Sequence, residues 1–192
     1  MLFYHERMER KMKKMLIFLW LVTLSLLTTS CTTASPEPLH NQYQITLTNV
    51  FEHQHSHSLY QFKKITEELS TVQDKEKLAY ISGMIDSNLI DNPAFLPAII
   101  LTNDETRQII ADEQLQSGVL TLYQYKRDYL KKLQSLIEQN DLTEIQNKRD
   151  ELKKLSTLMP KINDDRLFSN DKTKIESYKK DLEFVLQQFP KN

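Results

Sequence analysis

The sequence predicts an all-α protein, an up-and-down bundle of four or five helices that follows a signal peptide and a short tether. From Tyr43 onward, apolar residues recur every three or four positions, which is the spacing of one face of a helix. Capping residues precede several of these stripes, and prolines follow them. The 192 residues include only two glycines and no Asn-Gly or Asp-Gly pair, so a sheet with tight hairpins is disfavoured.

Residues 1–30 have the composition of a secretory signal peptide. Five basic residues precede an apolar stretch, Met15 to Leu27, and a small polar run ends at Ser30. An apolar helix of this length covers about 20 Å, whereas the hydrocarbon core of a bilayer is about 30 Å thick. A permanent membrane span is therefore disfavoured. Without residues 1–30 the chain has 20 basic and 24 acidic residues, a formal charge of −4.

The segment Leu27-Thr28-Thr29-Ser30-Cys31 resembles the lipobox of bacterial lipoproteins. The resemblance implies cleavage before Cys31, acylation of Cys31 and a location in the cell envelope, anchored to the membrane and facing outside the cytoplasm. One departure is Thr28, where the family usually has Leu. An ordinary secreted protein with a free thiol is the alternative, although unpaired thiols are disfavoured in oxidising compartments.

These features define three parts of the chain. Residues 1–30 are the expected signal peptide, and residues 31–42 are the lipidated cysteine with a small, polar, proline-containing tether. Residues 43–192 are the expected helical bundle domain. The resemblance covers residues 1–31 alone and implies nothing about the domain that follows.

The first expected helix covers residues 39–69. The alternation of Tyr43, Ile45 and Leu47 leaves a strand open at its start. A second helix, 78–89, is expected to end before Asn92-Pro93. The apolar piece Ala94 to Leu101, which contains Pro97, is expected to be a buried turn or a single short helix.

A longer helical run is expected between Thr102 and Asn140. Because Gly118 interrupts it, the pattern allows either one long helix with a weak point or two helices that meet there. Its apolar stripe consists of Leu115, Val119, Leu122, Tyr129, Leu133 and Leu136.

Two further helices complete the prediction. One begins with a capping box at Asp141 and Glu144 and ends at Pro160. The other begins after the cap residues 169–171 and ends at Pro190. Its stripe has steps of three and four residues, namely Ile175, Tyr178, Leu182, Val185 and Phe189. Stripes this narrow need partner helices, because a lone helix of this length is marginal in water.

A histidine-rich segment is the one cluster that suggests metal chemistry. In an extended backbone His53, His55 and His57 would share one face, with neighbours about 6.6 Å apart, which suits Zn²⁺ or Cu²⁺. In a helix, His53 and His57 would stack while His55 points away, which leaves half a site at best. Divalent-metal capture or sensing, with Zn²⁺ as the possible cofactor, is therefore the alternative function; a polar surface segment is the simpler interpretation.

Motifs of the common enzyme classes are missing from the sequence. It has no Gly-rich phosphate loop, no Gly-x-Ser-x-Gly elbow and no His-Glu-x-x-His, so we expect no enzymatic activity. The mild acidity of the domain disfavours nucleic acid as a partner.

The sequence therefore favours a small envelope lipoprotein that acts by binding an envelope protein or a wall component. Tyr123 and Tyr125 are the candidate interaction surface, since tyrosines bring both area and a polar tip to interfaces. Tyr129 belongs to the expected core stripe instead.

Overall fold

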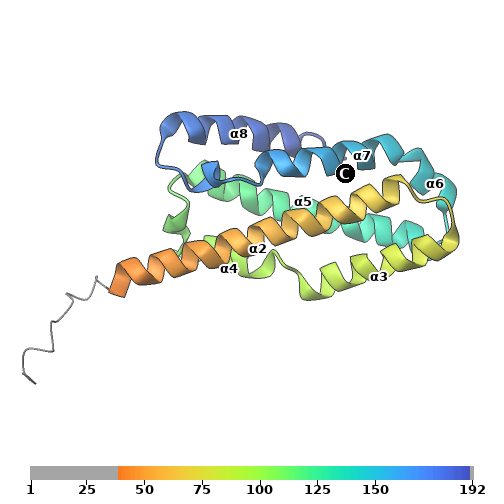
Figure 1. The fold of residues 1–192 in the computed structure, drawn as a ribbon, viewed down its shortest axis with the longest axis horizontal. Coiled ribbons are helices and arrows are strands. Elements are labelled where there is room, and N and C mark those ends of the chain that lie inside the picture. The colour runs from red at the N-terminus through yellow and green to blue at the C-terminus, as the bar shows by residue number, and fades with distance from the viewer. Residues whose placement is uncertain (1–38, 191–192) are drawn as a thin grey trace, which may run out of the picture. The chain divides into compact units, whose positions relative to one another are not determined.

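The computed structural model describes residues 39–190 (Figure 1), and contacts divide the chain into two units between Gln42 and Tyr43. The second unit contains the helical bundle, and its first helix begins a few residues before it, at Leu39. Every regular element from 39 to 190 is helical, which confirms the predicted all-α bundle. The elements are α2 (Leu39–Ser70), α3 (Lys75–Asp91), α4 (Phe95–Thr102), η1 (Arg107–Ile109), α5 (Glu113–Glu138), α6 (Leu142–Asn147), α7 (Arg149–Leu158), η2 (Met159–Ile162), η3 (Asp165–Phe168) and α8 (Lys172–Leu186).

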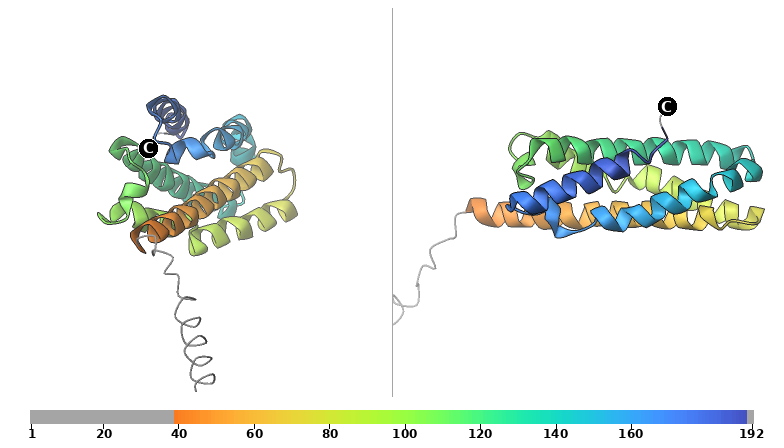
Figure 2. Two further views of the ribbon diagram at one scale, coloured as in Figure 1. Left: turned by 60° about the vertical axis from the view of Figure 1, so that its left-hand side comes forward. Right: turned by 90° about the horizontal axis from the view of Figure 1, so that it is seen from above.

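Helix α5 is central in the bundle, because it packs against α3 on one side and against α8 on another. Helix α2 runs along the bundle, and α3 turns back beside it after a short connection (Figures 1 and 2). Helices α6 and α7 return from the end of α5 and lead through η2 and η3 to α8. Within residues 39–190, none of the helices is both long enough and apolar enough to cross a bilayer.

Aspartates begin four of the helices as side-chain caps. Asp74, Asp112, Asp141 and Asp171 each accept a hydrogen bond from a backbone N–H in the first turn that follows, at 2.7–3.0 Å. The predicted cap at Asp141 is therefore confirmed. The long helix begins at Asp112 instead of near Thr102, because residues 103–111 form a turn and the short helix η1.

Gly118 does not interrupt α5, which continues as one helix from Glu113 to Glu138. A Cβ atom at Gly118 would lie 2.8 Å from Cδ2 of Leu182 on α8. The missing side chain therefore allows α5 and α8 to approach each other closely.

The structure decides one alternative that the sequence left open and changes two predicted boundaries. The strand considered at Tyr43 is absent, because residues 39–70 form the single helix α2. This helix includes the last four residues of the predicted tether, 31–42; the signal peptide, Cys31 and the remainder of the tether lie outside the described residues. The expected helix after Asp141 is divided at Lys148 into α6 and α7.

The apolar stripes predicted for α3, α5 and α8 form one core. Leu78, Ile81 and Ile85 of α3, and Tyr178 and Val185 of α8, are all at most 2% exposed. Helix α4 departs from its predicted burial: Pro97, Ile100 and Leu101 enter the core, whereas Phe95, Leu96 and Ile99 remain exposed.

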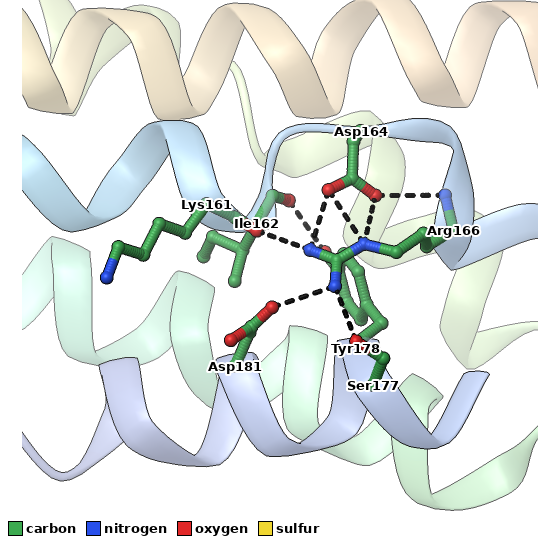
Figure 3. A network of polar contacts seen from close by, with 7 residues as sticks. All are labelled: Lys161, Ile162, Asp164, Arg166, Ser177, Tyr178 and Asp181. Atoms are coloured by element: carbon green, nitrogen blue, oxygen red, sulfur yellow. Dashed lines mark hydrogen bonds and ion pairs between the residues drawn. The ribbon is translucent and has the colours of Figure 1, made fainter. Parts of the chain in front are cut away.

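A network of hydrogen bonds and ion pairs around Arg166 links the η2–η3 segment to α8 (Figure 3). The Arg166 guanidinium donates to Asp164, to Asp181 at 2.8 Å and to the carbonyl of Lys161 at 2.7 Å. It lies over the Tyr178 ring, whose hydroxyl donates to the Ile162 carbonyl. The fork of the guanidinium is used within this chain, so the cluster is structural.

Candidate functional site

The three histidines of the predicted metal site do not converge. The backbone is helical here, so His53 and His57 stack on the outer face of α2 with ring centroids 6.4 Å apart, while His55 is 2% exposed and enters the core. Across the described part of the chain, no three His, Cys, Asp or Glu side chains come close enough together to hold a metal ion. The extended arrangement that would align all three imidazoles is therefore not formed.

His55 instead pairs with Tyr123 of α5 inside the bundle. The His55 Nδ1 and the Tyr123 hydroxyl are hydrogen-bonded at 2.7 Å, and the His55 Nε2 is buried without a hydrogen-bond partner among residues 39–190. Burial, and then the charge of Lys126, lowers the pKa of His55 to about 3. Burial also raises the pKa of the Tyr123 phenol. Both side chains are therefore neutral at physiological pH.

Tyr123 is consequently removed from the predicted interaction surface. It is 6% exposed, whereas Tyr125 is 41% exposed. Tyr125 lines a pocket of about 230 Å³ between α5 and the end of α8, with its ring centroid 5.9 Å from that of Phe189. Tyr129 is 4% exposed, as its place on the core stripe predicted. Of the two tyrosines of the predicted interaction surface, Tyr125 alone is exposed.

A buried lysine and serine lie next to this pair. The Lys126 ammonium, 4% exposed, donates to the carbonyl of Ser58 at 2.8 Å and also to the Ser58 hydroxyl. It lies 5.7 Å from the Phe62 ring centroid. Within residues 39–190 no carboxylate forms an ion pair with Lys126, and burial lowers the pKa of Lys126 to about 7.

A Ser–Lys pair can act as nucleophile and base in hydrolases, but this one does not admit a substrate. Ser58 is 2% exposed, and the cavity that Ser58 and Lys126 share with the α3–α4 turn has a volume of about 10 Å³. A space of this size holds a single water molecule. The pair is therefore a polar element of the core.

A surface groove lies between α2 and α3, and we call it the α2–α3 groove. Its volume is about 450 Å³. The residues that line it repeat every three or four positions on both helices, namely His57, Tyr60, Gln61, Lys64 and Ile65 on α2 and Tyr80, Gly83, Met84 and Ser87 on α3.

Polar bridges span the two helices beside this groove. The Asn88 amide donates to the Gln61 carbonyl oxygen at 2.6 Å, and Lys77 pairs with Glu68 at 2.8 Å. Between these bridges, nothing lies within 4 Å of the position that a Cβ of Gly83 would occupy. Polar contacts therefore link the two helices at both ends of the groove, and the groove wall is open at Gly83.

Tyrosines supply most of the exposed aromatic area of the groove. Tyr60 is 57% exposed and Tyr80 is 60% exposed, one on each helix, while buried Ile65 and half-buried Met84 form an apolar floor. This combination of an apolar floor and rigid amphipathic walls is typical of binding sites.

Comparison with known proteins found no matching family model, no matching curated protein and no matching solved structure.

Sequence reasoning missed the α2–α3 groove because its walls come from two helices whose pairing is a tertiary property. The signal in the sequence was a pair of tyrosines on the exposed faces of their helices. Tyr60 lies three residues from the polar His57, and Tyr80 lies three residues from the small Gly83. It also missed the contact between Ser58 and Lys126, which are 68 residues apart. The available sign of burial was that Lys126 lies four residues after Leu122 and three before Tyr129, both on the expected core stripe.

Proposed function

We propose that this protein is a lipid-anchored protein of the bacterial cell envelope that acts without catalysis, by holding a helix of another envelope protein in the α2–α3 groove. The proposal combines the lipobox-like segment ending at Cys31 with a groove that has the shape of a helix seat. The observation that carries the binding role is this groove between two bridged helices.

A helix is the occupant that fits the groove best. Both walls present residues at positions i, i+3 or i+4, and i+7, so a third helix can interdigitate with them along its length. The open space at Gly83 lets the backbone of that helix approach closely. Tyr60 and Tyr80 would flank it, with His57, Lys64 and Ser87 as polar contacts at the rim.

Photo-crosslinking in the native host tests the binding role. A photoreactive amino acid at Tyr80 should give one discrete adduct with an envelope protein. The matched control is Lys174, an exposed position on α8. Gly83→Leu, which fills the groove, should abolish the Tyr80 adduct while far-UV circular dichroism remains unchanged. Identical adducts from Tyr80 and Lys174, or an adduct that persists in Gly83→Leu, would refute the groove as the binding site.

Mass spectrometry of the native N-terminus tests the anchor separately. The proposal expects a chain that begins at an acylated Cys31, and Cys31→Ser should accumulate as an unprocessed precursor. An intact leader with a free thiol on the native protein would contradict the anchor but leave the crosslinking result unaffected.

A further inference from the structure

The pocket between α5 and the end of α8, with a volume of about 230 Å³, shares none of its lining residues with the α2–α3 groove. The buried rings of Phe189 and Tyr129 form its floor. Its sides are formed by the exposed Tyr125 together with Leu186 and Pro190. Drug-sized ligands occupy about 300–1,000 Å³, so this pocket suits a smaller molecule.

Aromatic rings supply most of the apolar surface of this pocket. The Phe189 ring centroid lies 5.9 Å from that of Tyr125 and 6.1 Å from that of Tyr129. The Tyr129 hydroxyl donates to Glu151 at 2.5 Å, so the polar tip of this tyrosine already has a partner within the chain. The ring contacts fix an apolar wall that can receive an apolar side chain.

Two opposite charges line the same pocket, one helical turn apart on α5. Asp128 and Lys132 are at positions i and i+4, where the side chains of a helix are neighbours. Asp128 is partly buried, yet within residues 39–190 its carboxylate has no hydrogen bond and no ion pair. Lys132 has an interaction of its own, and its ammonium, with three hydrogens, can donate to more than one acceptor.

From this arrangement we infer that the pocket binds a small zwitterion, namely an α-amino acid with an apolar side chain. The ammonium of the ligand would bind Asp128 and its carboxylate would bind Lys132. Its side chain would enter among the aromatic rings of the pocket. This inference goes beyond the binding of a partner helix, and it depends neither on the α2–α3 groove nor on the lipid anchor.

The charges of the pocket disfavour simpler ligands. Lys132 would repel a cation that has no anionic group, and Asp128 would repel an anion that has no ammonium. An uncharged apolar molecule would cover the Asp128 carboxylate and remove its water without replacing it, which costs free energy. The two charged groups of an α-amino acid are joined through one carbon atom, so both can reach side chains that are one helical turn apart.

Isothermal titration calorimetry tests the inference on the full-length chain in an uncharged detergent. The probes are leucine, methionine and phenylalanine, each titrated separately, with detergent alone as the blank. Two analogues of the amino acid that binds most tightly each remove one charge: its amide lacks the carboxylate, and its N-acetyl derivative lacks the ammonium. Each analogue should bind about tenfold more weakly or worse, because it loses one charge-assisted hydrogen bond.

Two single variants assign the two charges to their residues. Asp128→Asn should weaken binding of the amino acid by about tenfold or more but should not weaken binding of the N-acetyl derivative. Lys132→Gln should weaken binding of the amino acid to a similar degree but should not weaken binding of the amide. Glu138→Gln is the matched control, because Glu138 is an exposed carboxylate of the same helix outside the pocket. It should bind as the unaltered chain does, and so should Gly83→Leu.

Several outcomes would overturn the inference. One is the absence of binding by all three amino acids up to millimolar concentrations. An amide or N-acetyl derivative that binds as tightly as the amino acid would show that the pocket does not recognise both charges. An unchanged affinity in Asp128→Asn would place the bound molecule elsewhere. Binding that requires removal of residues 191–192, which follow Pro190, would assign the pocket to the end of the protein's own chain.

Discussion

Replacement of Lys126 by Met should stabilise the protein, and the gain should depend on pH. Burial lowers the pKa of Lys126 from 10.5 to about 7. At 1.36 kcal/mol per pKa unit, the buried ammonium costs roughly 5 kcal/mol of folding free energy below pH 7. Met leaves the hydroxyl and carbonyl of Ser58 without this donor, which costs about 1–3 kcal/mol. We expect a net gain of about 2–4 kcal/mol at pH 6.

The pH dependence follows from where the proton is bound. Between pH 7 and 10.5 the unfolded chain holds the Lys126 proton and the folded chain does not, so the free energy of unfolding rises with pH. The rise should be about 3 kcal/mol from pH 7 to 9.5, below the range where unfolded tyrosines ionise. The Lys126→Met variant should lack this rise.

Urea unfolding followed by circular dichroism, repeated from pH 6 to 9.5, measures both effects. Lys131→Met is the matched control, because Lys131 lies on the exposed face of the same helix. Its unfolding free energy should follow that of the unaltered protein at every pH. A flat or falling profile for the unaltered protein, or the same slope in Lys126→Met, would refute the burial of an unpaired ammonium.

Three further substitutions test individual contacts. Gly83→Ala should raise the free energy of unfolding by about 0.5–1 kcal/mol, since the new methyl meets open space and Ala favours the helix; an unchanged urea midpoint would contradict this. Gly118→Ala should gain less than Gly83→Ala, because Leu182 must move, and an equal shift in midpoint would show that α5 and α8 are not in close contact. Arg166→Lys should lower the melting temperature, with a loss of about 1–2 kcal/mol, because a lysine cannot reproduce the guanidinium fork; a melting curve that overlays the unaltered one would show that the cluster is dispensable.

The faces of the helices could be predicted from the sequence because apolar spacing reports directly on which side is buried. Tyr178 and Val185 entered the core as predicted. The spacing of apolar residues cannot identify the buried face of a helix whose exposed face also lacks polar side chains. In α4 nearly every residue is apolar, so the pattern could not show that Phe95 and Ile99 face outward while Ile100 faces inward.

The candidate sites were harder to predict, because they depend on which helices become neighbours. Nothing in the segment around His55 indicates that its partner would be Tyr123, which is 68 residues away. A helical backbone was one of the two options for the histidines, and it separates them. Tyr123 follows Val119 by one turn of helix, a spacing that already indicated the core rather than the surface.

The unbroken length of α2 fixes distances along the bundle, which bears on the proposed attachment at Cys31. Its 32 residues give an axis of about 48 Å, and only seven residues separate Cys31 from Leu39. Along that axis, His57 and Lys64 lie roughly 27 and 38 Å from Leu39, the first residue of α2. The helix therefore fixes the distance between its own first residue and any molecule bound beside its second half, and shortening α2 by whole turns should reduce that distance in steps of about 5.4 Å.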